Sequence, residues 1–183
     1  MRYILALVPP EQQKRAYVQA AQTAFSSICD GYMLSEEKSL PHITLCSFQC
    51  DDEKLTQIYR GIEKWKINSC SMRVMGLMLK KGKVPPHHYS VSLSIAREPA
   101  ILHLHYQTLH LLNDFNITPL NPNEDLYFPH LTLAGIRFAD SVSLTPIIDD
   151  LISMPVDPFR LVLGRGDDIG QYLETLHQFN EIS

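Results

Sequence analysis

One pentapeptide occurs twice in this chain and constrains the fold more than any other feature. Pro-His-Ile-Thr-Leu at positions 41–45 is matched by Pro-His-Leu-Thr-Leu at positions 129–133. Residues i and i+2 of a β-strand face the same side, so His42 projects with Thr44, and His130 with Thr132. The alternate aliphatic residues then enter the core. The pattern predicts two strands that each present an imidazole and a hydroxyl on one face.

The elements around the two pentapeptides follow one plan: strand, long helix, strand, helix and further strand. We expect strands at 3–8, 40–48, 70–79, 88–95, 128–138, 159–163 and 172–179, and helices at 11–28, 51–65 and 98–115, with a short one after Ser143. Tyr3 precedes His42 by 39 residues, as Val91 precedes His130.

This plan predicts an α+β fold with a duplicated lobe, in which each lobe is an antiparallel sheet with helices outside and a groove lies between the lobes. We expect a single domain over 1–183, with halves of about 1–86 and 87–183.

The composition is that of a globular protein. Of 183 residues, 45% are apolar and 20% charged, and the net charge of −4 excludes a broad binder of duplex DNA or RNA. Short apolar runs predict no signal peptide or membrane span. The cysteines, at 29, 46, 50 and 70, form no C-x-x-C pair, so we expect free thiols in the cytoplasm. We also expect a monomer.

Two imidazoles and two hydroxyls in one groove suit phosphodiester chemistry. A neutral imidazole takes a proton from the attacking oxygen, and a protonated one gives a proton to the leaving oxygen. Threonine hydroxyls donate to the phosphate oxygens, and neither metal nor cofactor is required. Unperturbed imidazoles titrate near pH 6.5, which predicts a bell-shaped pH profile around neutrality. The alternative is that each histidine is a buried residue satisfied by the backbone.

The paired His-x-Thr strands on a duplicated α+β lobe resemble the 2H phosphoesterase superfamily. Its members include bacterial RNA 2′,3′-cyclic phosphodiesterases (historically 2′-5′ RNA ligases), plant cyclic phosphodiesterases and viral 2′-5′ oligoadenylate phosphodiesterases. The resemblance covers essentially the whole chain and implies RNA processing or nucleotide hydrolysis. By it, His42 and His130 are the catalytic pair, and Thr44 and Thr132 hold phosphate.

Further residues are candidates for substrate binding. His88 and Ser90 share the polar face of an alternating strand, which either lines the groove or faces solvent. Tyr127 and Phe128 precede the second pentapeptide and either stack a base or pack in the core. Arg165 is the one cation of its turn and either reaches phosphate or stays in solvent. The lysines at 80, 81 and 83 draw phosphates toward the site or simply solvate a turn.

Two other functions stay open. One is a nucleotide-binding module that uses the same groove without turnover. The other is a metal-dependent hydrolase built on His103, His105 and His110, although residues 103 and 105 point to different faces of a helix and lack the i, i+4 spacing of helical ligand pairs. The sequence contains neither a P-loop nor a dinucleotide-binding motif.

Overall fold

The computed structural model describes residues 1–67, 70, 72–81, 88–120, 127–137, 158–168 and 170–179. Its strands are β1 (Arg2–Val8), β2 (Cys29–Met33), β3 (Ile43–Gln49), β4 (Val74–Lys81), β5 (His88–Ile95), β6 (His130–Arg137), β7 (Arg160–Gly166) and β8 (Tyr172–Gln178). Its helices are α1 (Glu11–Phe25), α2 (Asp52–Ile62) and α3 (Pro99–Asp114). The predicted helix after Ser143 falls outside the described residues. The α+β class is confirmed.

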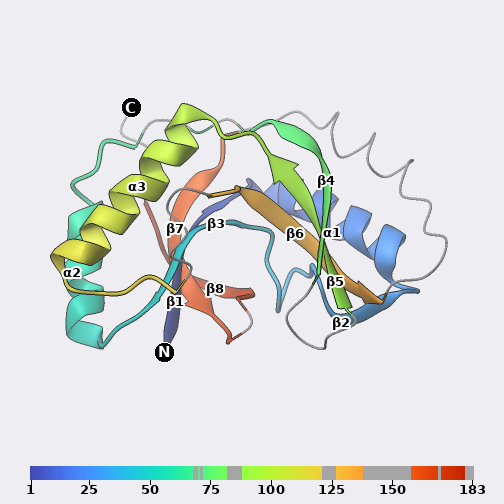
Figure 1. Ribbon diagram of the computed structural model, residues 1–183, viewed down its shortest axis with the longest axis horizontal. Coiled ribbons are helices and arrows are strands. Elements are labelled where there is room, and N and C mark those ends of the chain that lie inside the picture. Colours follow the sequence, from blue (N-terminus) through green and yellow to red (C-terminus); the bar gives the residue numbers. More distant parts are fainter. Residues whose placement is uncertain are drawn as a thin grey trace.

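The eight described strands form one antiparallel sheet in the order β4-β5-β6-β3-β1-β7-β8, with β2 paired to β6 (Figure 1). Each end of this sheet draws on both halves of the chain. At one end β4 pairs with β5, and at the other β7 pairs with β1. The halves also meet in the middle of the sheet, where β3 pairs with β6. That the chain forms a single domain of two lobes stays a prediction.

Helices α1 and α3 pack against different strands of the sheet. α1 packs against β2 and β6, whereas α3 packs against β3 and α2 (Figure 1). β1 is buried on both faces: Tyr3, Leu5 and Leu7 join the large core, while Ile4 and its alternate neighbours form a small apolar cluster on the other side. This double burial explains why β1 is a continuous apolar run.

Sequence periodicity located most elements but missed β2. The predicted helix 11–28 ends at Phe25, and its last residues form a turn that leads into β2. The sequence of β2, Cys-Asp-Gly-Tyr-Met, contains two poor strand formers, and Gly31 has a φ of 101°. Asp51 caps α2, because its side chain accepts a hydrogen bond of 2.8 Å from the Lys54 backbone N–H.

β3 and β6 carry a β-bulge at corresponding places. In β3 the register shifts between Thr44, opposite Ala6, and Cys46, opposite Leu5, so that Leu45 is the extra residue. In β6 it shifts between Thr132, opposite Ser92, and Ala134, opposite Val91, so that Leu133 is extra.

This register also shows which residues of β1 and β5 correspond. Ala6 faces Thr44 as Ser92 faces Thr132, so the counterpart of Tyr3 is Tyr89. Tyr3 and Val91, which precede His42 and His130 by the same 39 residues, are therefore not equivalent positions in the two halves.

Among the helices of the described residues, none has the length and apolar character needed to cross a membrane.

Candidate functional site

The two His-x-Thr segments lie side by side because β3 and β6 pair antiparallel with Ile43 opposite Leu131. This register puts His42 across from Thr132, and Thr44 across from His130. Directly opposite residues have Cβ atoms about 4.5–5.5 Å apart, and diagonal ones such as the two histidines about 7–8 Å. All four side chains therefore belong to one face of the sheet, while Ile43 and Leu131 are fully buried on the other.

Each imidazole is held by the same local hydrogen bond. Nδ1 of His42 lies 2.8 Å from the Leu40 carbonyl oxygen, and Nδ1 of His130 lies 2.8 Å from that of Phe128. A carbonyl only accepts, so Nδ1 carries the proton in both rings. Nε2 is then the nitrogen left for a ligand, and it is the basic one while the ring is neutral.

Both imidazoles favour the neutral form in the free protein. Burial lowers the pKa of His42 to about 4; the bond to the Leu40 carbonyl opposes this shift, and the charge of His130 adds to it. Burial also lowers the pKa of His130, the bond to the Phe128 carbonyl opposes that shift, and the Lys80 ammonium adds to it. Lys80 therefore contributes positive charge to this face.

The surroundings of the two motifs differ. The ring of Tyr172 lies 5.3 Å from that of His42, between centroids, and belongs to the small apolar cluster with Ala6. Around the second motif the neighbours are hydroxyls: Ser92 donates a 3.3 Å hydrogen bond to Thr132, which also hydrogen-bonds the Tyr32 hydroxyl. One end of the face is apolar and the other polar.

Two of the predicted substrate-binding residues lie near the motifs. Ser90 alternates with Ser92 along β5 and pairs with Lys80 of β4, so it belongs to the face that carries His130. Phe128, two residues before His130, is 57% exposed, and the Arg97 guanidinium lies 5.9 Å from its ring centroid. An exposed aromatic ring beside a cation offers a surface for stacking.

Tyr127 and Arg165, also predicted to bind substrate, do not face that surface. Tyr127 is 7% exposed and stacks in the core on His105, so the prediction that it stacks a base is corrected. Arg165 lies opposite Tyr3, on the other face of the sheet, and its guanidinium pairs with Glu174. The side chain of His88 falls outside the described part of the structure.

The histidines of α3 do not gather. His103 and His110 are exposed, whereas His105 is buried with its Nδ1 2.7 Å from the Leu45 carbonyl oxygen. Within the described residues, no three His, Cys, Asp or Glu side chains are grouped so as to hold a metal ion.

Three neighbours of the site were missed by the sequence analysis. Tyr32 lies on β2, a strand that periodicity did not reveal. Tyr172 was predicted only as the start of the last strand, and Arg97 was given no role. No local pattern signals Tyr32 or Tyr172, since each reaches the site through the long-range pairing of its strand. The alternation of serines along β5 is the one signal that pointed to Ser92.

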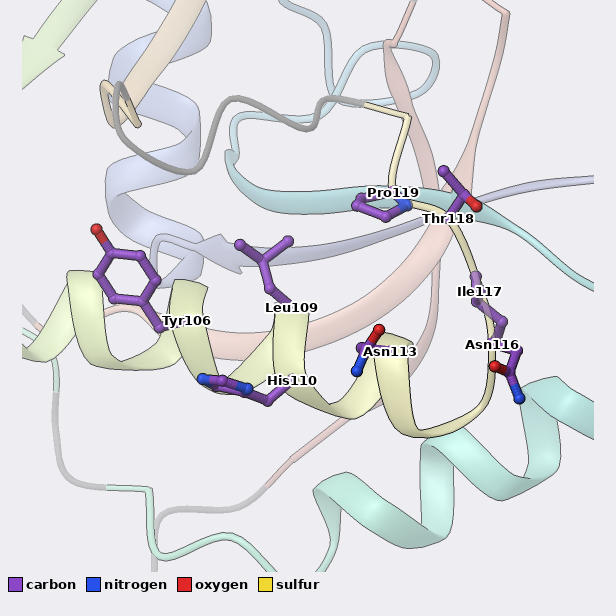
Figure 2. A pocket seen from close by; sticks show the side chains of 8 residues that line it. All are labelled: Tyr106, Leu109, His110, Asn113, Asn116, Ile117, Thr118 and Pro119. Carbon is purple, nitrogen blue, oxygen red and sulfur yellow. The ribbon is translucent and has the colours of Figure 1, made fainter.

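A hollow of about 500 Å³ lies elsewhere, beside the C-terminal half of α3 and the segment that follows it (Figure 2). Its lining runs along one side of α3 from Tyr106 to Asn113 and continues to Pro119. Neither histidine nor threonine of the two motifs lines it, so it is separate from the candidate site.

Solved structures with this fold are known. A Thermus thermophilus protein matches with a TM-score of 0.60 and 16% identity over 98% of this chain and 97% of its own. E. coli LigT, solved with 3′-AMP, matches with a TM-score of 0.58 and 12% identity over 97% and 96%. Kluyveromyces marxianus Usb1 matches with a TM-score of 0.50 and 10% identity over 96% of each chain.

The chain has the fold of the 2H phosphoesterases. The resemblance drawn from the paired pentapeptides is thereby confirmed at the level of fold. By sequence, no protein-family model and no curated protein matches the chain. The 2H phosphoesterase fold was thus recognisable here from two short segments and from the structure.

The lowered pKa of His42 predicts a pH-dependent stability. Unfolded histidine titrates near pH 6.5 and His42 in the folded protein near 4, so between these values the unfolded chain binds more protons. The free energy of unfolding therefore falls as the pH is lowered from 6.5 toward 4. In His42→Asn the amide replaces the Nδ1 donor. We expect the free energy of unfolding of this variant to fall by about 1–3 kcal/mol less than that of wild type between pH 6.5 and pH 4.

Urea denaturation followed by the fluorescence of Trp65, the single tryptophan, measures this difference. His103→Asn, at an exposed position of α3, is the matched control and should keep the wild-type pH dependence. Parallel stability curves for wild type and His42→Asn would show that His42 titrates normally in the folded protein.

Proposed function

We propose that this protein is a metal-independent phosphodiesterase that acts on a 2′,3′-cyclic phosphate or a 2′-5′ linkage of a nucleotide or short RNA. The observation that carries the proposal is the β3–β6 register, which sets each imidazole directly across from a threonine, and the two imidazoles diagonal to each other, on one face. Binding alone needs no such pair of groups able to give and take protons. In this proposal, the two motifs belong to duplicated lobes, and the shared face is the floor of a groove between them.

In the proposed hydrolysis, Nε2 of one neutral imidazole takes a proton from water as the water oxygen bonds to phosphorus. The bond from phosphorus to one ribose oxygen breaks, and that oxygen receives a proton from Nε2 of the other, protonated imidazole. Thr44 and Thr132 donate to the non-bridging oxygens, where negative charge builds up. The product is a phosphomonoester beside a free ribose hydroxyl, and proton exchange with water resets the pair.

The surroundings of Thr132 support this role. Its hydroxyl accepts from Ser92 and also hydrogen-bonds the Tyr32 hydroxyl, so two neighbours hold Thr132 in place on this face. Lys80 adds positive charge near His130 without a direct role in the proton transfers. Among the structures that share the fold, E. coli LigT was solved with 3′-AMP, with ATP and with NADP+, so that protein binds nucleotides. We propose the same class of ligand for this chain.

A nucleotide-binding module without turnover is the competing function, because LigT was solved with ligands that contain no cyclic phosphate. Incubation with a 2′,3′-cyclic mononucleotide in EDTA separates the two. Turnover supports the phosphodiesterase, and binding without turnover supports the module. A product assay with four substrates then identifies the substrate class: a cyclic mononucleotide, an RNA end with a cyclic phosphate, a 2′-5′ oligoadenylate and an ADP-ribose cyclic phosphate.

The first prediction concerns the four motif side chains. His42→Ala and His130→Ala should each lower kcat by about two to four orders of magnitude, the usual contribution of one acid or base. Thr44→Ala and Thr132→Ala should each cost about 1–3 kcal/mol of transition-state stabilisation. Steady-state kinetics on a 2′,3′-cyclic nucleotide in EDTA measures these losses.

His110→Ala removes an exposed histidine of α3 and should keep the wild-type rate. A wild-type rate in either motif histidine variant would mean that the residue has no part in catalysis. Activity that disappears with chelator and returns with zinc or manganese would favour a metal-dependent hydrolase instead.

The second prediction concerns pH. The base must be neutral, so activity falls as the pH drops through its pKa; the acid must be protonated, so activity falls as the pH rises through its pKa. Because both pKa values are lowered in the free protein, the bell of kcat/KM should peak below pH 6.5 and not at neutrality. Bound phosphate favours charged imidazole, so the kcat profile should lie at higher pH.

Rates measured from pH 4 to 9 in EDTA test this profile. The two limbs belong to the coupled pair and not to single residues. A single sigmoid that rises toward high pH would indicate one lone base or a metal-bound hydroxide.

The third prediction concerns Phe128, which we propose stacks the nucleobase of the substrate. Stacking of one base contributes about 1–3 kcal/mol, so Phe128→Ala should raise KM for a cyclic nucleotide by about 5- to 150-fold and leave kcat nearly unchanged. Phe128→Tyr should keep the wild-type KM. Tyr106→Ala, which removes an exposed ring from the separate hollow, is the control. An equal loss on ribose 2′,3′-cyclic phosphate, which has no base, would contradict stacking.

A further inference from the structure

The bulge after Thr44 interrupts the pairing of β3 with β1 beside the site. Leu45 has no partner on β1, because Cys46 pairs with Leu5 and Thr44 with Ala6. A bulge interrupts the hydrogen-bond ladder, and buried carbonyls must find other donors. Here the donors are two side chains from distant parts of the chain. The Tyr127 hydroxyl donates to the Thr44 carbonyl over 2.9 Å, and His105 Nδ1 donates to the Leu45 carbonyl over 2.7 Å.

The two donors pack directly on each other, and we call them the His105–Tyr127 pair. Their rings are stacked, with centroids 3.9 Å apart and planes inclined by 7°. His105 is 1% exposed and Tyr127 7% exposed, so neither ring touches a substrate. Burial raises the pKa of Tyr127, so its hydroxyl stays protonated and keeps donating.

The corresponding bulge of β6 is held differently. The Leu133 carbonyl accepts a hydrogen bond of 2.9 Å from the backbone N–H of Leu34. A main-chain N–H thus holds the bulge carbonyl of the second motif, whereas side chains hold those of the first. The first motif can therefore be loosened by changing a single atom of one side chain.

Tyr127 also links the two motifs through the chain. It stands three residues before His130 and one before Phe128, whose carbonyl accepts the His130 Nδ1 proton. Its hydroxyl donates a hydrogen bond to the carbonyl of Thr44, the residue directly across from His130. One side chain therefore ties the entry of β6 to the site segment of β3, beside the single pairing of Ile43 with Leu131.

We propose that His105 and Tyr127 are positioning residues, which fix the Thr44–Leu45 bulge and thereby the placement of Thr44 and His42 relative to His130. The effect on turnover rests on the proposed function, whereas the effect on the bulge does not. A group misplaced by about 1 Å can cost on the order of a hundredfold in rate, so a small relaxation of the bulge has a large effect.

The test compares Tyr127→Phe, which keeps the stacked ring and removes only the hydroxyl, with Tyr17→Phe, which removes a buried hydroxyl from α1. We expect Tyr127→Phe to lower kcat on a 2′,3′-cyclic nucleotide by about 10- to 100-fold, with KM within twofold of wild type. Tyr17→Phe should keep kcat. On α3, His105→Leu should lower kcat in the same way, and His105→Asn, which restores a donor near Nδ1, should recover part of it.

Amide NMR spectra supply a second readout that needs no activity. In Tyr127→Phe the Thr44, Leu45 and Cys46 amides should show exchange broadening that Tyr17→Phe lacks. Inactive wild-type protein would overturn the proposed function, and the amide spectra would then decide the role of the pair alone. If Tyr127→Phe keeps the wild-type kcat, or if its bulge amides match those of wild type, the positioning role is overturned.

Discussion

The pairing of Ile43 with Leu131 is the constraint on which the rest of the site depends. A slip of one residue would turn one motif's histidine and threonine to the core face, since side chains alternate along a strand. That slip is opposed by the aliphatic residues of both motifs, all fully buried at 43, 45, 131 and 133. Burying each of them contributes about 1.5–3 kcal/mol. The core therefore fixes the register, and the register brings the two imidazoles together.

The same motif operates here in two unlike environments. His42 stands against Tyr172 and an apolar cluster, whereas Thr132 is held by the hydroxyls of Ser92 and Tyr32. Burial is nevertheless the largest cause of the lowered pKa at both histidines, and it outweighs the bond that each Nδ1 donates to a backbone carbonyl. The two motifs thus share the direction of the pKa shift but not their neighbours, which the adjoining strands supply.

Periodicity alone predicted which motif residues face the core and which share the other face. It could not predict across-strand neighbours, because the pairing of β3 with β6 joins segments 88 residues apart at Ile43 and Leu131. Tyr127 and Phe128 show the same limit. These adjacent aromatic residues take opposite environments, and Tyr127 is the buried one, stacked on His105 and bonded to the Thr44 carbonyl. Arg165 was predicted to reach phosphate but lies on the face opposite the motifs, because its pairing with Tyr3 sets its orientation. Tyr32 was not predicted because β2 was not predicted, since Asp and Gly in its sequence are poor strand formers.

The bulges have a consequence for how such strands evolve. Before the bulge the outward positions of β3 are 42 and 44; after it Cys46 and Phe48 belong to the core, so the alternation changes phase within one strand. β6 changes phase in the same way, with Ala134 in the core. Substitutions in the second part of each strand can therefore be selected for packing without altering which side the histidine and threonine occupy. The short polar segment can therefore be kept while the apolar residues that follow it change. This agrees with the 10–16% sequence identity between this chain and solved structures of the same fold.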